Sequence, residues 1–135
     1  MIEHFYEQIA DLIDELGITL LDCTSSPKNH DYKNEYIAFV TIKEVRRLQT
    51  GMVFYTDGPS SYHKYTFECR LLGKQGDCSD RSALIEKADA LRAALDADGF
   101  SATLCHNDRI DPVLSRAECL LKITMDLFTS PSGGN

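Results

Sequence analysis

Apolar side chains recur along this chain with two periods, and the periods divide it into helices and strands. A spacing of three or four residues over residues 2–16 predicts an amphipathic helix, with Gly17 at the position where helices commonly end. The same spacing predicts a second helix, which begins at Ser79 or Asp80 and ends at Gly99. Its core stripe consists of Leu84, Ala88, Leu91 and Leu95.

Five further segments are predicted to be strands, from short apolar runs or from alternation of apolar and polar residues. They are residues 18–23, 35–49, 62–72, 100–105 and 115–128. In residues 62–72 and 115–128 every second side chain is apolar, which predicts strands with one buried and one polar face. Residues 35–49 begin as an apolar run and become polar and basic after Thr41. We expect this strand to start in the core and to continue past it.

The order of these elements predicts an α+β fold with a mostly antiparallel sheet and two helices packed on one face. Residues 35–49 and 62–72 would form a long β-hairpin that projects from the body, joined through a turn at 51–60. A chain of 135 residues fits one core, so we expect a single domain over residues 1–129. The Ser- and Gly-rich tail, 130–135, is predicted to be disordered.

Composition narrows the class of protein. Hydrophobic residues make up 43% and charged residues 26% of the chain, which is typical of a soluble globular protein. No apolar run approaches the roughly 20 residues that span a bilayer, and the first residues are acidic where a secretory signal would be basic. We therefore expect a protein that is made and kept in a cytosol, with no membrane partner.

The five cysteines have irregular spacing and no Cys-x-x-Cys pair. An odd number without a pattern argues against a disulfide framework and against a structural zinc site. We interpret them as reduced thiols, most of them in the core.

Charge is unevenly distributed. The first 22 residues hold six acidic side chains and no Lys or Arg, whereas residues 23–76 hold eight basic and five acidic ones. Glu3, Glu7 and Asp11 are spaced by four along the polar side of the first helix. The net charge of −7 argues against a nucleic-acid partner. The contrast would suit head-to-tail self-association, and ordinary solvated faces are the alternative.

The expected hairpin is basic and aromatic. Lys43, Arg46 and Arg47 lie beyond its core part, and Phe54 and Tyr55 lie in an unusually apolar turn. Such side chains are common at protein interfaces, although charges on an edge strand also block aggregation. Both interpretations remain open. The candidate interface residues are Glu3, Glu7, Asp11, Lys43, Arg46, Arg47, Phe54 and Tyr55.

Catalytic motifs are absent from the sequence, which contains no Gly-x-Ser-x-Gly elbow and no Gly-rich phosphate loop. Cys105 and His106 with Asp108 are the one cluster that resembles a nucleophile or ligand set. Neighbouring residues on a strand point to opposite faces, so Cys105 and His106 would not readily converge on one atom. We therefore expect no catalytic residue, no cofactor and no metal, and an enzyme built on this cluster is the alternative.

The layout resembles the tail-terminator and tail-completion proteins of long-tailed phages and prophages. The resemblance covers about residues 1–128 and depends on the Ile-rich first helix, the strand in YHKYTFECRLLG, the helix SDRSALIEKADALRAALD and the closing strand SRAECLLKITMDLF. It implies a homo-oligomer, usually a hexameric ring that caps the tail tube and contacts other tail or head–tail connector proteins. The protein would then occur in the virion tail and, during assembly, in the host cytoplasm. A small cytosolic binding or regulatory module that recognises a protein partner is the alternative.

Overall fold

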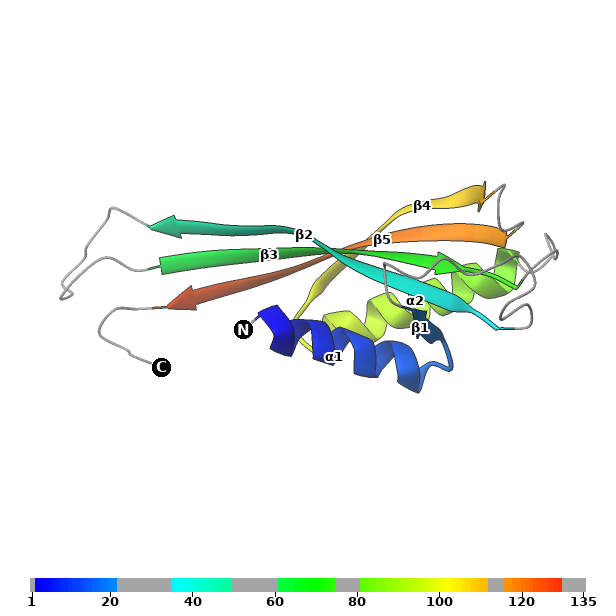
Figure 1. The fold of residues 1–135 in the computed structure, drawn as a ribbon, viewed down its shortest axis with the longest axis horizontal. Coiled ribbons are helices and arrows are strands. Elements are labelled where there is room, and N and C mark those ends of the chain that lie inside the picture. Colours follow the sequence, from blue (N-terminus) through cyan, green and yellow to red (C-terminus); the bar gives the residue numbers. More distant parts are fainter. Residues whose placement is uncertain (1, 22–34, 50–60, 75–80, 112–115, 130–135) are drawn as a thin grey trace.

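The fold is described from a computed structural model of the chain (Figure 1). The described residues are 2–21, 35–49, 61–74, 81–111 and 116–129. The whole of the expected turn at 51–60, including Phe54 and Tyr55, and the tail at 130–135 lie outside the described residues. The prediction of a disordered tail therefore stays a prediction.

The described elements are α1 (Ile2–Glu15), β1 (Thr19–Leu21), β2 (Ile37–Gln49), β3 (Ser61–Leu72), α2 (Arg81–Ala97), β4 (Ser101–Asp111) and β5 (Arg116–Thr129). The strands form one sheet in the order β1-β2-β3-β5-β4. β1 is parallel to β2, and the other three pairs are antiparallel. The protein is therefore α+β, with a mixed sheet and two helices.

Both helices end at the glycines that the sequence indicates. Gly17 has a φ of 74° and Gly99 a φ of 94°, a left-handed conformation that side chains with a Cβ rarely adopt. The amide of Ile18 then donates to the carbonyl of Ile13 at 3.2 Å, and the amide of Phe100 makes the corresponding bond at 3.0 Å. The chain reverses in both places and buries the apolar residue that follows.

The core lies between the helices and the sheet. α1 contributes Phe5, Ile9 and Ile13, α2 contributes Leu84, Ala88, Leu91 and Leu95, and the two central strands contribute Tyr65, Phe67, Cys69, Leu71, Cys119, Leu121 and Ile123. These are the apolar stripes that the sequence pattern predicts. Each large apolar side chain buried in this way contributes roughly 1.5–3 kcal/mol.

β3 is flanked by a strand on each side along its whole length. It pairs with β2 from Leu72, opposite Ile37, to Ser61, opposite Gln49. β5 accompanies it over the same length and ends with Thr129 opposite Ser61. The segment expected as a two-stranded hairpin is thus part of three adjacent strands.

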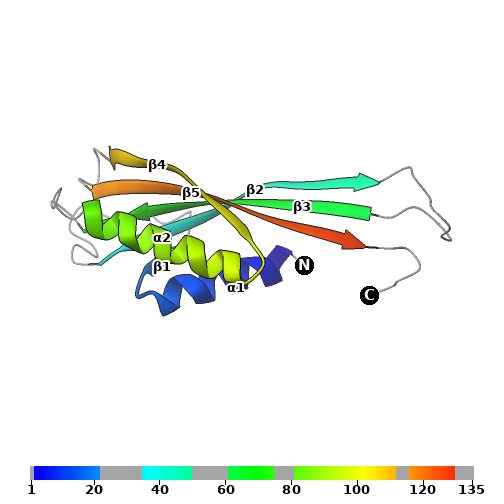
Figure 2. The ribbon, with the colours of Figure 1, turned by 180° about the vertical axis from the view of Figure 1, so that it is seen from behind.

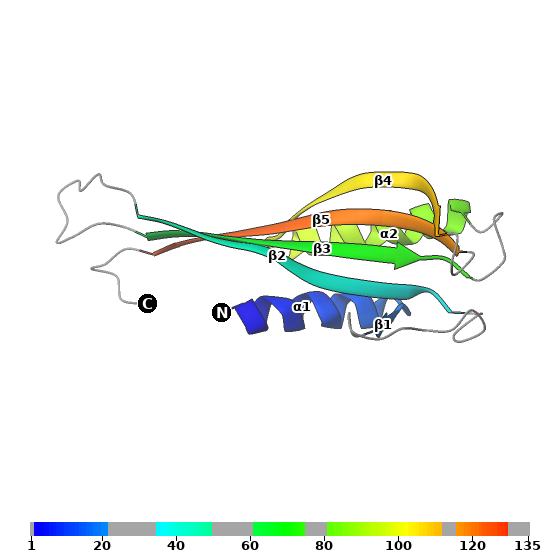
Figure 3. The ribbon, with the colours of Figure 1, turned by 45° about the horizontal axis from the view of Figure 1, so that its top comes forward.

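One end of these three strands extends past the helices. Figures 1, 2 and 3 all show β2, β3 and β5 continuing beyond the N-terminal end of α1. We call residues 42–49, 61–67 and 123–129, which the register places side by side, the arm. Its base, at Tyr65, Phe67 and Ile123, is still buried in the core, and its outer part extends past the helices (Figure 1).

β4 differs from the prediction. A strand at 100–105 and a turn at 106–108 were expected, but β4 continues to Asp111, opposite the start of β5. Its register against β5 shifts on both sides of His106. The turn prediction is wrong because an edge strand needs hydrogen bonds on one side only, so extra residues are absorbed as bulges.

Lys87 ties the two helices together. Its ammonium donates to the carbonyl of Leu16 at 2.8 Å, just after the end of α1, and lies 5.0 Å from the centre of the Tyr36 ring. A cation is favourable at a helix C-terminus because of the helix dipole, and it is favourable over an aromatic ring because of the ring's negative face. The contact fixes α1 relative to α2 and to the start of β2.

Candidate protein interface

A β-bulge decides which side chains the arm presents. The register of β2 against β3 shifts immediately after Ile42, so Lys43 is an extra residue. Ile42 lies opposite Phe67 and Val45 opposite Tyr65. Two residues three apart would face opposite sides of a regular strand. The bulge brings Ile42 and Val45 onto one face, the face that carries the core.

On this apolar face, the side chains of β3 next to the bulge are buried and those of β2 are half exposed to solvent. Phe67 and Tyr65 are buried, whereas Ile42 is 49% and Val45 50% exposed. Large apolar side chains with this exposure are few among the described residues, and the only other one is Ile110 in β4. Ile42 and Val45 lie side by side and form a small apolar patch on the extended strand.

The same stretch of β2 is an open edge of the sheet. β1 pairs with β2 only at Ile37, Ala38 and Phe39. From Thr41 to Gln49, β2 has no neighbouring strand on that side within the part of the chain that the structure describes. An edge of this length can accept a further strand from another chain.

Helix α1 lies beside this edge and forms a hollow with it. Glu3, Tyr6, Glu7 and Ile42 line a hollow with a volume of about 330 Å³. The two carboxylates belong to exposed residues of α1, and the apolar surface comes from Tyr6 and Ile42. The hollow therefore combines apolar surface with negative charge.

Phe5 fixes the helix in this place. Its ring meets Tyr65 of β3 edge-on, with 5.1 Å between ring centres, and Phe100 edge-on at 6.0 Å. Edge-to-face contacts of buried rings contribute roughly 0.5–1.5 kcal/mol each beyond the area they bury. The N-terminal turn of α1 is thus anchored at the base of the arm.

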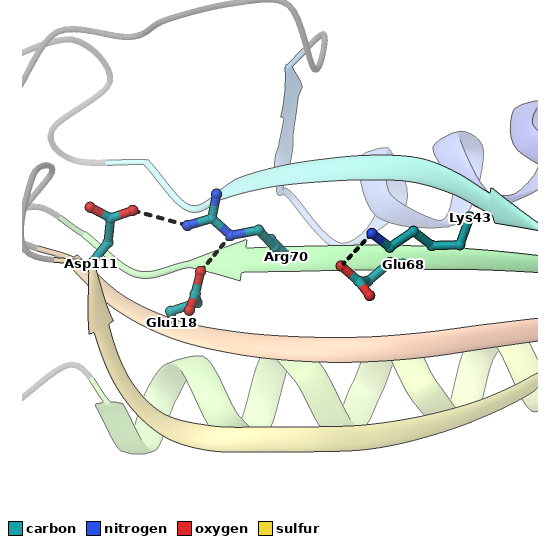
Figure 4. A network of polar contacts seen from close by, with 5 residues as sticks. All are labelled: Lys43, Glu68, Arg70, Asp111 and Glu118. Atoms are coloured by element: carbon teal, nitrogen blue, oxygen red, sulfur yellow. Dashed lines mark hydrogen bonds and ion pairs between the residues drawn. The ribbon is translucent and has the colours of Figure 1, made fainter.

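The basic residues of the arm have neighbours on their own sheet. Arg46 pairs with Glu44 at 2.8 Å and Lys43 with Glu68 at 3.8 Å, as Figure 4 shows for the second pair. The Arg46 and Lys43 side chains are 56% and 52% exposed. Exposed pairs of this kind contribute at most about 1 kcal/mol, so a partner could replace them at small cost. The side chain of Arg47 lies outside the described residues.

The acidic candidates lie where the helical pattern places them. Glu3, Glu7 and Asp11 are all exposed on α1. Only Glu3 and Glu7 line the hollow. The sequence offers no signal for this difference, because it depends on how α1 docks against the sheet.

A second set of charges is structural. Arg70 of β3 donates to Asp111 of β4 at 2.9 Å and forms an ion pair with Glu118 of β5 (Figure 4). Burial alone would lower the pKa of Arg70, but the bonds and charges of Glu118 and Asp111 outweigh it and raise that pKa. The cluster joins three neighbouring strands on the face away from the helices.

Arg116 is a buried residue that the sequence pattern did not single out. Its side chain is 1% exposed, and one guanidinium nitrogen donates to the carbonyls of Glu35 and Gly73 at 2.9 Å each. Burial lowers its pKa, and the charge of Glu35 opposes that effect. Arg116 therefore joins the start of β5 to the chain before β2 and after β3.

Of the three residues in the alternative nucleophile cluster, the structure describes the side chains of Cys105 and His106. Cys105 is exposed on β4, with its sulfur 3.8 Å from the carbonyl of Thr103. His106 is half-buried, and the side chain of Asp108 lies outside the described residues. Among the described residues, no group of three or more His, Cys, Asp and Glu side chains is placed to hold a metal.

Two thiols are in the core, as the strand pattern predicts. Cys69 and Cys119 are buried. Burial raises the pKa of Cys69 to about 12 and that of Cys119 to about 11. Thiols protected in this way are poor nucleophiles. Cys23 and Cys78 lie outside the described residues.

Comparisons with known proteins give no family. The sequence matches no known protein family and no curated protein. Within the described residues, neither helix has the length and apolar character needed to cross a membrane. The surface formed by the arm and α1 is therefore the feature from which a function can be inferred.

Proposed function

We propose that this protein is a structural component of a phage or prophage tail, of the tail-terminator or tail-completion kind, and that it works by forming a ring. In this proposal the two helices cover one face of the sheet, and the arm projects beyond them to reach the next copy. The contacts are between proteins and involve no catalysis.

The observation that carries the proposal is the apolar pair on the open edge of β2. Ile42 and Val45 are half exposed, and the bulge at Lys43 places them on one face. Proteins normally shield a long edge strand from other chains. Beside the charges of Lys43 and Arg46, this edge also presents two β-branched apolar residues, which favours its being covered by a partner.

The distribution of charge supports a copy of the same chain as that partner. The arm carries Lys43 and Arg46, and the exposed side of α1 carries Glu3, Glu7 and Asp11. Contact between the arm of one copy and the α1 side of the next joins two different surfaces. Such a head-to-tail contact generates a closed ring when the rotation between copies closes. A hexamer is the ring size that the family resemblance implies.

The hollow favours a second candidate function. A cavity of about 330 Å³ with Glu3 and Glu7 at its wall could receive a basic, apolar segment of an unrelated protein. The protein would then be a small binding or regulatory module. It would remain a monomer or dimer in solution, and a pull-down would recover one partner protein that is unrelated to phages.

Light scattering coupled to size-exclusion chromatography tests the proposal over a wide range of concentration. We expect the wild type to form a ring-sized oligomer, and the Arg46→Glu/Arg47→Glu variant to dissociate at concentrations where the wild type does not. Arg92→Glu/Arg109→Glu is the matched control, since it reverses two exposed or half-exposed charges outside the arm. A wild type that is monomeric at every concentration would contradict the ring.

A further inference from the structure

The hollow beside α1 has the size of a socket for side chains. Its volume of about 330 Å³ is at the lower end of the range for ligand pockets, roughly 300–1,000 Å³. It can take one or two bulky side chains of a chain segment. Tyr6 and Ile42 give the hollow apolar walls, which favour an apolar occupant. Glu3 and Glu7 give it negative charge, which favours a segment that carries positive charge.

The chain itself contains a segment with this chemistry. Met52–Tyr55 is an apolar run of Met, Val, Phe and Tyr, and it follows the basic pair Arg46 and Arg47. We infer that the hollow of one copy binds Met52–Tyr55 of a second copy. The inference rests on the proposed ring and names its contact: an apolar plug on a basic arm enters an acidic, apolar socket.

Geometry favours a plug that comes from another copy. Ile42 lies seven residues before Gln49 with one bulge between them, so along the strand the two are about 20 Å apart. The loop is tied at both ends, because Gln49 pairs with Ser61. Phe54, five residues beyond Gln49, could reach back about 17 Å only if the loop were fully extended and turned straight back.

Electrostatics favours the approach of the second copy. α1 holds Glu3, Glu7, Asp11, Asp14 and Glu15 and no Lys or Arg. A basic arm that approaches this helix is attracted before contact, and the attraction weakens as salt concentration rises. Like charges spaced by four along α1 repel each other, and a basic partner relieves that repulsion.

Two complementary variants test the inference directly. Phe54→Ser/Tyr55→Ser removes the plug and keeps the socket, whereas Ile42→Asp removes the socket and keeps the plug. Each variant alone should be monomeric by analytical ultracentrifugation. Mixed in equal amounts they should form a one-to-one dimer and stop there, because each dimer has one intact contact and no further usable ends. The site of Ile42 is half exposed, so both proteins should fold, as circular dichroism will show.

A labelled peptide of residues 46–58 measures the affinity of the socket. The receptor is the full chain with Phe54→Ser/Tyr55→Ser, and fluorescence anisotropy reports binding. We expect Glu3→Lys/Glu7→Lys in that receptor to raise Kd at least tenfold. The matched control, Asp14→Lys/Glu15→Lys, reverses two exposed charges of α1 that do not line the hollow and should change Kd less than threefold.

The outcomes separate this inference from the proposed function. If wild type forms rings and Phe54→Ser/Tyr55→Ser forms them equally well, the plug and socket are refuted and the ring stands. Equal peptide binding by the Glu3→Lys/Glu7→Lys receptor and its control would also refute the socket. If wild type is monomeric at every concentration, the ring is refuted, whatever the peptide does.

Discussion

Replacing the exposed apolar pair on β2 is the sharpest test of how the arm is used. Ile42→Thr and Val45→Thr, singly and together, keep a β-branched side chain suited to a strand. They replace the ethyl group of Ile42 and one methyl group of Val45 with hydroxyls, which are costly to bury under a partner. We expect the double variant to fold and to associate with itself much more weakly than the wild type.

The magnitude follows from the exposed fractions. Fully burying a Val or Ile side chain contributes roughly 1.5–3 kcal/mol. Ile42 is 49% and Val45 50% exposed, so about half of each contribution is still available to a partner. The pair would then contribute about 1.5–3 kcal/mol to each contact, which corresponds to a ten- to hundredfold change in Kd.

Sedimentation velocity over a dilution series measures this change, and Ile110→Thr is its control. Ile110 is 45% exposed and lies on β4, at the opposite edge of the sheet. It should lower the free energy of unfolding about as much as Ile42→Thr and leave self-association unchanged. An Ile42→Thr/Val45→Thr variant that associates as tightly as the wild type would refute the reasoning, and so would an equal weakening by Ile110→Thr.

Further predictions concern stability and the thiols. Arg116→Met should lower the free energy of unfolding by about 3 kcal/mol in urea titration, because two backbone carbonyls bonded at 2.9 Å lose a charged donor. Gly17→Ala should lower it by about 1 kcal/mol in the same titration, because φ is 74°. Burial raises the pKa of Cys69 to about 12 from 9.0, so the thiol loses its proton at lower pH in the unfolded chain than in the folded protein. The free energy of unfolding should therefore fall as pH rises above about 9. Cys69→Ala should make this decrease with pH smaller. Cys105, exposed on β4, should react with a disulfide reagent at pH 7 no faster than a thiol in a short peptide; a hundredfold faster reaction would revive the enzyme alternative.

Local signals account for the part of the fold that the sequence predicts. The helix ends at Gly17 and Gly99 depend on one residue that tolerates a positive φ, and that residue is visible in the sequence. The alternation of apolar and polar residues in β3 and β5 indicates which face is buried, because both strands have one face in the core. The sequence therefore predicts the type of these helices and strands correctly and their bounds to within a few residues.

Pairing between distant residues accounts for what the sequence does not show. The continuation of β4 to Asp111 depends on its register against β5, which overrides the turn tendency of Asn and Asp. The bulge at Lys43 likewise appears only when β2 is aligned with β3. A plain alternation count would put Ile42 and Val45 on opposite faces.

The sequence does not reveal the hollow, for a similar reason. Glu3 and Glu7 were candidates because of their charge and spacing, but their place beside Ile42 depends on Phe5 packing against Tyr65. That contact joins the first helix to a strand some sixty residues further along the chain. The charge pattern therefore predicts which side chains are candidates, but it does not predict the hollow that they line.

The central position of β3 also governs when the protein can become functional as it folds. Its two neighbours come from very different places in the chain: β2 precedes it, and β5 begins only at Arg116, after α2 and β4. Until β5 pairs, one side of a twelve-residue strand stays uncovered. Pairings this distant in sequence form slowly. The socket beside α1 depends on Tyr65 of that strand, so copies should join only after the last strand is in place.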